Sequence, residues 1–152
     1  MKTILFLSDT HGNLSAIQKL NGIMRDCDYI VHAGDYYHDL REWQDEYCDK
    51  IYQVKGNCDG GGGDLVFEVE NVKVLLTHGD KYGVKSSIFK LLLRAKEVGA
   101  NLVLYGHTHV ADVLEVDGIT LINPGSMSKF HDNSYCYIVI NKDKIVCKIV
   151  NF

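Results

Sequence analysis

The sequence predicts an α/β fold, and three observations support this. Short apolar runs alternate with stretches of helical spacing through the first two thirds of the chain, which is typical of strands and helices built into one sheet. Hairpin signals fill the last third, so the chain is expected to end in antiparallel strands. The 152 residues, 46% apolar and 24% charged, fit one globular domain and exclude a disordered or fibrous chain. We therefore expect a single domain over residues 1–152.

The expected elements follow in order along the chain. Strands are predicted at residues 4–7, 29–32, 51–54, 65–69, 72–77 and 102–105, and two terminal hairpins pair 110–116 with 119–123 and 135–140 with 144–150. A first helix is predicted from Leu14 to Met24, with Asn13 as its cap. A short helix is predicted at 39–48, and the clearest one at 86–98, with Gly99 in the left-handed position just after it.

Charge and cysteine content exclude several classes of protein. Sixteen basic and twenty acidic residues give a net charge of −4, and no basic tract is present, so the protein is not expected to bind extended nucleic acid. The five cysteines are odd in number and form no C-x-x-C pair, which argues against a disulfide framework and a cysteine zinc site. The apolar run near the N-terminus has only four residues, too few for a signal peptide or a membrane span. We expect a reduced, cytoplasmic protein without membrane contact.

Metal-ligating side chains follow five of the predicted strands. In open α/β sheets, binding sites form just beyond the carboxyl ends of the strands, so ligands from separate strands can converge on one small volume. The residues that follow these strands are Asp9 and His11, Asp35, Asn57, His78, and His107 and His109.

The chemistry of this set indicates two metal ions. Two carboxylates, four imidazoles and one amide oxygen are too many for one tetrahedral zinc ion, but they suit two ions that share a bridging carboxylate. Nitrogen and oxygen donors suit manganese, iron, nickel or zinc. Two pairs, Asp9 with His11 and His107 with His109, have i, i+2 spacing, which places their side chains about 6.6 Å apart along one face of extended backbone. Each member can then reach a different ion.

Five short motifs together resemble a known superfamily. They are Asp9-Thr10-His11, Gly34-Asp35, Gly56-Asn57-Cys58-Asp59, His78-Gly79 and Gly106-His107-Thr108-His109. In this order they resemble the motifs of the calcineurin-like metallophosphoesterases. The small size and the segment Asn123-Pro124-Gly125-Ser126 are similar to the single-domain YfcE-type phosphodiesterase branch.

The resemblance implies a fold and a mechanism. The implied fold is two facing mixed β-sheets flanked by helices, the four-layer sandwich of this superfamily. Four ligands would hold a first metal and four a second, with Asp35 shared and a hydroxide between the ions as the nucleophile. The first set is Asp9, His11, Asp35 and His109, and the second is Asp35, Asn57, His78 and His107. The implied catalytic residues are Asp35, Asn57 and His107. The implied cofactors are two divalent ions, with manganese favoured over nickel, iron or zinc, and the implied substrates are small phosphodiesters.

Three positions depart from the family pattern. Cys58 stands where many members have a histidine that protonates the leaving group, and a thiol of ordinary pKa is a weak donor to an alkoxide. Asp80 stands where this branch frequently has a second histidine. The arginine often found after the N-P-G-S segment is missing, and Lys129 is the nearest cation in sequence. The sequence leaves open whether these three residues take part in catalysis.

Other polar and aromatic residues have a structural interpretation beside the functional one. His32 is predicted to lie in the core or behind the ligands, and His38 and His131 in loops. For Asp59, orientation of Asn57 and simple exposure are equally expected. Packing is favoured for the aromatic residues near Tyr36, although Tyr36 itself follows Asp35 and could wall the pocket.

Alternative functions remain. A binding or scaffolding module is the main one, because a retromer subunit shares the fold implied by the resemblance and acts in assembly. A scaffold is free to lose metal ligands, and none of the seven is missing here, which favours an enzyme. A phosphomonoesterase and a homo-oligomer are both compatible with the sequence.

Overall fold

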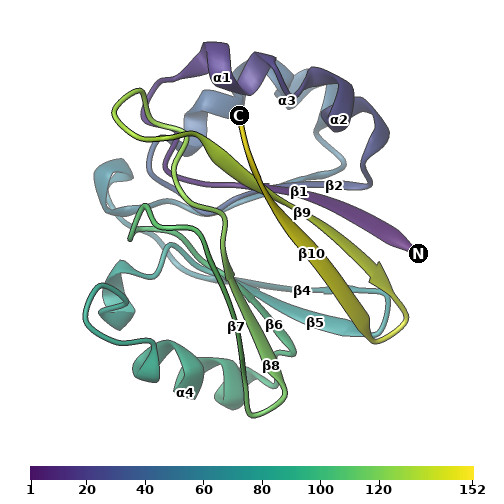
Figure 1. The fold of residues 1–152 in the computed structure, drawn as a ribbon, viewed down its shortest axis with the longest axis vertical. Coiled ribbons are helices and arrows are strands. Elements are labelled where there is room, and N and C mark those ends of the chain that lie inside the picture. The colour runs from purple at the N-terminus through teal and green to yellow at the C-terminus, as the bar shows by residue number, and fades with distance from the viewer.

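The computed structural model describes all residues 1–152 and contains two five-stranded sheets that face each other (Figure 1). Sheet A contains both terminal segments. Its strand order is β10 (Lys144–Asn151), β9 (Ser134–Asn141), β1 (Lys2–Leu7), β2 (Tyr29–His32) and β3 (Ile51–Gln53). The central strand β1 pairs parallel with β2 and antiparallel with β9, so the sheet is mixed.

Sheet B is built from the middle of the chain. Its order is β4 (Leu65–Val69), β5 (Val72–Leu76), β6 (Leu102–Leu104), β8 (Ile119–Asn123) and β7 (Asp112–Val116). β5, β6 and β8 run parallel, while β4 and β7 form antiparallel edges through hairpins. The predicted fold, two facing mixed sheets with flanking helices, is confirmed.

The side chains of β1 explain why its sequence reads as a continuous apolar run. Ile4 and Phe6 point into a core between the two sheets, while Leu5 and Leu7 join a second core under the helices, and all four are fully buried. A strand covered on both faces loses the alternation of a half-exposed strand. Truncation of Phe6 to alanine would cost about 3–5 kcal/mol, the usual cost for a large core aromatic residue.

Helices cover the outer faces of both sheets (Figure 1). Sheet A is covered by α1 (Leu14–Gln18), α2 (Asn21–Asp26) and α3 (Arg41–Tyr47), and sheet B by α4 (Phe89–Val98). Three short 3-10 turns, η1 (Tyr37–Leu40), η2 (Asn57–Asp59) and η3 (Asp80–Tyr82), lie in connections between elements. No helix combines the length and apolarity that crossing a membrane requires.

The helix predicted from Leu14 to Met24 is corrected to two shorter ones. Lys19 and Leu20 separate α1 from α2, and Leu20 leaves helical geometry at φ −94° and ψ 3°. Asn21, the first residue of α2, accepts a hydrogen bond of 2.6 Å from the Trp43 indole, a contact that apolar spacing does not encode. Asn13 does precede α1, but its side chain makes no capping hydrogen bond and donates to the Met127 carbonyl instead.

Two further helix boundaries are also corrected, and the predicted turns are confirmed. The helix predicted at 39–48 begins as the 3-10 turn η1, and the helix predicted at 86–98 begins only at Phe89. Gly99 ends α4 with φ 75°, as predicted. Asp117 and Gly118 both have positive φ in the β7–β8 turn, which is the conformation that favours an Asp-Gly hairpin. All five cysteines are free thiols.

Candidate metal centre

The seven side chains predicted as ligands lie together where strands of both sheets end. Asp9 and His11 follow β1, Asp35 follows β2, and Asn57 follows β3, all from sheet A. The ligands from sheet B are His78 after β5, and His107 and His109 after β6. Each of these strands runs parallel to its neighbour in this set, so their carboxyl ends meet at one edge of the molecule.

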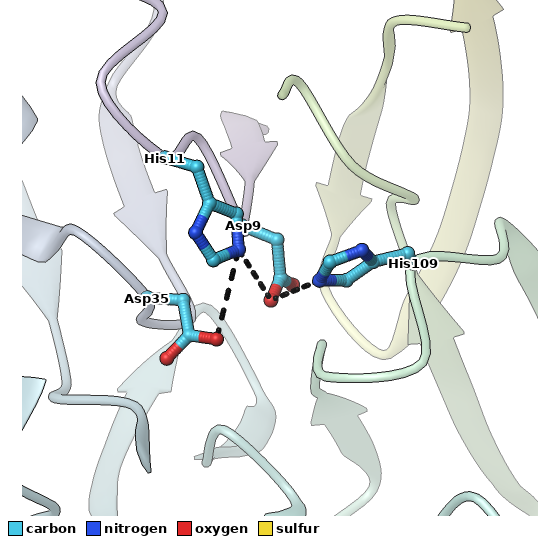
Figure 2. Close-up of side chains that lie close together, drawn as sticks. All are labelled: Asp9, His11, Asp35 and His109. Atoms are coloured by element: carbon cyan, nitrogen blue, oxygen red, sulfur yellow. Dashed lines mark ion pairs between the residues drawn. The ribbon is translucent and has the colours of Figure 1, made fainter. Parts of the chain in front are cut away.

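A first group brings together Asp9, His11, Asp35 and His109 (Figure 2). Their ligand atoms all lie within 4.8 Å of one another. Nε2 of His109 lies 3.2 Å from Oδ1 of Asp9, and Nε2 of His11 lies 3.7 Å from Oδ2 of Asp35. Figure 2 shows His11 and His109 directing their Nε2 atoms toward the carboxylates. The two carboxylates are buried, whereas the two imidazoles remain about a quarter exposed, at 23% and 26%.

A second group shares Asp35 with the first. It contains Asp35, His78 and His107, again with ligand atoms within 4.8 Å of one another. Nε2 of His78 lies 3.5 Å from Oδ2 of Asp35, 3.2 Å from Nδ1 of His107 and 2.9 Å from Oδ1 of Asn57. Asp35 therefore stands between the two groups.

Two buried atoms in the first group have no hydrogen-bond partner. They are Oδ1 of Asp9 and Nε2 of His11, which lie 3.9 Å apart. The other oxygen of Asp9 is satisfied, because it accepts hydrogen bonds from the Ser8 hydroxyl at 2.6 Å and the His107 amide at 3.0 Å. Unpartnered buried polar atoms are costly, and a cation between them would satisfy both. The donor set thus fits a metal ion.

Hydrogen bonds also fix which atoms of the second group face the centre. Nδ1 of His78 donates to the Ala33 carbonyl at 2.8 Å, so Nε2 is the ring nitrogen that faces Asp35 and Asn57. Oδ1 of Asp35 accepts from the Cys58 amide at 2.9 Å, so that Oδ2 faces the histidines. Backbone groups of the neighbouring loops therefore orient both side chains.

Five of the seven candidate ligands have a strained backbone. Asp9, His11, Asp35, His107 and His109 all have φ between 44° and 71°, the left-handed region that residues other than glycine rarely adopt. Each such residue costs about 1–3 kcal/mol, and this strain persists only where the surroundings hold it. Five of the nine non-glycine residues with positive φ are candidate ligands, which supports this edge as a candidate functional site.

Buried Asp39 holds the loop after β1. One of its oxygens accepts hydrogen bonds from the Thr10 hydroxyl at 2.6 Å and from the Gly12 amide at 2.7 Å. Thr10 and Gly12 flank His11 in sequence, so this carboxylate fixes the backbone that presents Asp9 and His11. The sequence predicts Asp39 only as part of a helix, and no local pattern in it indicates this contact.

Asp59 holds two other loops together. Its side chain is only 2% exposed and accepts hydrogen bonds from the amides of Tyr36, Tyr37 and Gly56. The first two amides lie directly after Asp35, and the third lies directly before Asn57. Of the two roles left open by the sequence, simple exposure is therefore wrong, and the carboxylate joins the loops that carry two candidate ligands.

Two glycines in the motifs allow these loops to approach closely. A Cβ at Gly56 would lie 2.2 Å from Oδ1 of Asp35, and a Cβ at Gly106 would lie 2.1 Å from the Ser8 hydroxyl and 2.6 Å from Oδ2 of Asp9. No side chain fits at such distances. The glycines are required by the carboxylates packed against them.

Electrostatics favour an ionised Asp9 and a neutral His107. Burial acts to raise the pKa of Asp9, yet the neighbouring imidazoles of His109 and His78 leave that pKa below its ordinary value. The Asp9 carboxylate, with Oδ1 3.2 Å from Nε2 of His109, in turn raises the pKa of His109. Burial lowers the pKa of His107, and the charges of His78 and Lys85 lower it further. Anionic carboxylate and neutral imidazole are the forms that bind metal.

Three histidines lie outside the ligand set: His32 is buried, and His38 and His131 are exposed. His32 is fully buried, accepts a hydrogen bond from the Gly34 amide and contacts the Thr10 hydroxyl, and burial lowers its pKa to about 4. It lies behind the ligands, as predicted. His131 lies in a loop, as predicted, but its ring packs against His109 with centroids 4.8 Å apart. No pattern in the sequence predicts the contact between His131 and His109.

Cys58 lies beside the candidate site with an exposed thiol. Burial of part of the side chain and the charge of Asp35 raise the pKa of this thiol. It is therefore protonated at neutral pH and is not an activated nucleophile.

Comparison with known proteins assigns the family. The family model described as the calcineurin-like phosphoesterase superfamily domain matches residues 1–144. The chain belongs to the calcineurin-like phosphoesterase superfamily. A curated relative, the probable metallophosphoesterase YsnB of Bacillus subtilis, is 33% identical over 130 residues, which cover 82% of this chain and 74% of the relative. Phosphodiesterase YfcE of Escherichia coli is 24% identical over 155 residues, covering 84% and 80%. These matches support the YfcE-type branch of the calcineurin-like phosphoesterases.

Solved structures agree with this assignment. A predicted phosphoesterase from Streptococcus pneumoniae has a TM-score of 0.81 and 26% identity, over 99% of this chain and 89% of that one. Vps29 from Entamoeba histolytica has a TM-score of 0.78 but only 19% identity, over 99% of both chains, and shows the shared fold. Membership among the calcineurin-like phosphoesterases implies hydrolysis of phosphoesters with divalent metal ions, and the structure supplies two groups of residues that could hold them.

Proposed function

We propose that this protein is a two-metal phosphodiesterase that hydrolyses small phosphodiesters. The observation that carries the proposal is the pair of ligand groups that share Asp35, with Oδ1 of Asp9 and Nε2 of His11 buried and unpartnered between the side chains. A single four-coordinate ion would leave three of the seven donors unused.

In this proposal each metal takes four donors. Asp9, His11, Asp35 and His109 would hold the first metal, and Asp35, Asn57, His78 and His107 the second. When bound, two divalent ions polarise phosphoryl oxygens and lower the pKa of bound water. Their four positive charges exceed the two negative charges of Asp9 and Asp35, so an acidic protein gains a local site that attracts phosphate. All seven donors are nitrogen or oxygen, which suit manganese, nickel, iron and zinc alike, and among these we favour manganese, as the family resemblance implies.

The chain's own residues orient the proposed ligands, and none of them supplies a strong acid for the leaving group. The Ala33 carbonyl holds His78 in one tautomer, and the Cys58 amide holds one oxygen of Asp35. The Cys58 thiol, which is protonated at neutral pH, lies where a histidine would protonate the leaving group in many family members. Substrates whose leaving groups are stable anions, such as phenolates, therefore suit this site best.

The test combines metal loading with a matched pair of amide variants. The protein is stripped of metal, reloaded with manganese, nickel or zinc, and assayed with bis-p-nitrophenyl phosphate. Asn57→Ala removes one proposed ligand and should abolish turnover, while Asn71→Ala, at an exposed position in the β4–β5 turn, should retain it. Circular dichroism and melting temperature check the fold of both variants. Turnover by metal-free protein, or full activity of Asn57→Ala, would contradict the proposal.

A scaffolding module is the second candidate, favoured by the fold shared with Vacuolar Protein Sorting 29 structures. The complete ligand set speaks against it. A protein that binds two metal ions and yet hydrolyses none of a panel of phosphodiesters and phosphomonoesters would support the scaffold instead.

A further inference from the structure

Five aromatic rings form a continuous row along the exposed side of the candidate metal centre. Successive ring centroids lie 5.3, 5.2, 5.3 and 4.8 Å apart. The order of the row is His38, Tyr36, His11, His109 and His131. The third and fourth rings, His11 and His109, are candidate ligands, and the other three rings belong to residues outside the ligand set.

The outer rings are open to solvent although they border a buried site. Tyr36 is 37% exposed and the His38 side chain is 47% exposed. The carboxylates of Asp9 and Asp35, in contrast, are buried. Aromatic rings therefore make up one exposed side of the centre, where an ester group of a substrate bound at the carboxylates can contact them.

Tyr36 is fixed in a conformation that a bulky side chain rarely adopts. Its φ is 66°, in the left-handed region. Its amide donates to Oδ1 of Asp59 at 2.9 Å, and its carbonyl accepts from the Thr10 hydroxyl at 3.3 Å. Both partners also hold loops that carry candidate ligands. The backbone strain therefore places the Tyr36 ring at a set position relative to the metal centre.

Packing alone does not account for this arrangement. Tyr36 belongs to none of the three apolar clusters, and its ring packs against two histidines. The His38 ring stacks on it at an interplanar angle of 30°, so each ring covers part of one face of the other, and the remaining exposed surface of the pair is aromatic. Such surfaces bind planar groups by stacking.

We propose that Tyr36 and His38 form a subsite for a planar aromatic ester group, so that the substrates are aryl or nucleoside phosphodiesters. The proposal rests on the phosphodiesterase function proposed above, and it specifies the class of substrate. The phosphoryl group lies at the buried carboxylates and imidazoles, and one aromatic ester group lies along the Tyr36 end of the row.

Binding of three phosphomonoesters tests the subsite without requiring turnover. Methyl phosphate, phenyl phosphate and thymidine 5′-phosphate carry the same phosphoryl group but differ in the attached ester group. Calorimetry on manganese-loaded protein gives the three dissociation constants. Phenyl phosphate should bind at least about fivefold more tightly than methyl phosphate, the low end of the effect of stacking on an aromatic side chain. The thymidine ester shows whether a nucleobase is accepted as well as a simple aryl ring.

Three variants test whether the Tyr36 ring causes the preference for phenyl phosphate. Tyr36→Asn removes the ring but keeps a residue that tolerates positive φ, and it should abolish the preference for phenyl phosphate. Tyr36→Phe keeps the ring and should retain the preference. Phe89→Ala removes another exposed aromatic side chain, on α4, and should leave all three affinities unchanged.

The outcomes separate this proposal from the function on which it rests. Equal affinities for methyl and phenyl phosphate, or a preference that survives Tyr36→Asn, would overturn the subsite even if bis-p-nitrophenyl phosphate is hydrolysed. A preference that disappears only in His131→Gln would place the aromatic group at the other end of the row and overturn the assignment to Tyr36. Ring-dependent binding without hydrolysis of the diester would refute the phosphodiesterase and leave an aromatic phosphoester-binding site.

Discussion

Replacement of Asp59 by alanine tests how strongly one buried carboxylate holds the metal centre together. Asp59 accepts three backbone hydrogen bonds, at 2.9 Å from Tyr36, 2.9 Å from Gly56 and 3.4 Å from Tyr37. These amides belong to the loops after β2 and β3, which carry Asp35 and Asn57. Alanine leaves all three amides without this acceptor.

The expected loss of stability follows from the two shorter hydrogen bonds, those from the Tyr36 and Gly56 amides. A hydrogen bond to a charged group contributes about 1.5–3 kcal/mol, so the two together contribute about 3–6 kcal/mol before solvent compensates. Water reaches part of these loops, and we expect a net loss of about 2–3 kcal/mol in the free energy of unfolding. For a chain of this length that corresponds to a melting temperature lower by about 4–12 °C. Residues that support metal ligands typically contribute 10- to 100-fold to metal affinity, and the same loss is expected here.

The assay measures unfolding by urea and metal affinity by titration of the stripped protein. Asp49→Ala is the control, because Asp49 is exposed and the substitution changes the net charge equally. Asp59→Asn keeps one acceptor oxygen and should give an intermediate loss. If Asp59→Ala melts like the Asp49→Ala control and binds metal as tightly, the carboxylate does not hold the loops and the reasoning is refuted.

Three further predictions concern other residues. His107→Ala should reduce the metal content of loaded protein from two ions per chain to one, measured by elemental analysis, and two retained ions would exclude His107 as an essential ligand. Cys58→His should speed the hydrolysis of alkyl diesters more than that of aryl diesters, because a positioned proton donor contributes about 10²–10⁴-fold; an unchanged ratio in a leaving-group series would contradict this. Burial acts to raise the pKa of Asp28, but its hydrogen bonds to Thr3 lower it overall. Asp28 therefore stabilises the fold above its unfolded pKa of about 3.9, and this contribution is lost as pH falls through the lower folded value. Asp28→Asn should cost less than about 1 kcal/mol at neutral pH, since the side chain is partly exposed, and should make the acid-induced loss of stability shallower; identical acid unfolding curves would contradict it.

The strands and the ligand positions could be predicted because their signals are local. The two-sided burial of β1 appears directly as four consecutive apolar residues, and each candidate ligand lies within a few residues of a strand end. The convergence of the ligands followed from the parallel arrangement of those strands. The roles of the individual ligands stay predictions until metal is bound.

The contacts that sequence reasoning missed are all long-range. The break between α1 and α2 accompanies a contact between Asn21 and Trp43, while the apolar spacing continues across it. The contacts of Asp39 with the loop after β1, and of His131 with His109, join segments that are distant in sequence. Such pairs carry no periodicity or spacing, so only the assembled fold reveals them.

The two sheets differ in how far apart their strands lie along the chain, and this difference sets an order for folding. All strands of sheet B fall between Leu65 and Asn123 without interruption, joined by hairpins and single crossovers. Sheet A is interrupted by the whole of sheet B, since β1 pairs with β9 in a register that places Lys2 opposite Ile140. Closing that long loop carries a large entropic cost, so sheet B is expected to acquire amide protection first and the β1–β9 pairing last. Because the candidate ligands come from both sheets, the candidate metal site is completed only when sheet A packs against sheet B, and bound metal would slow the separation of the sheets.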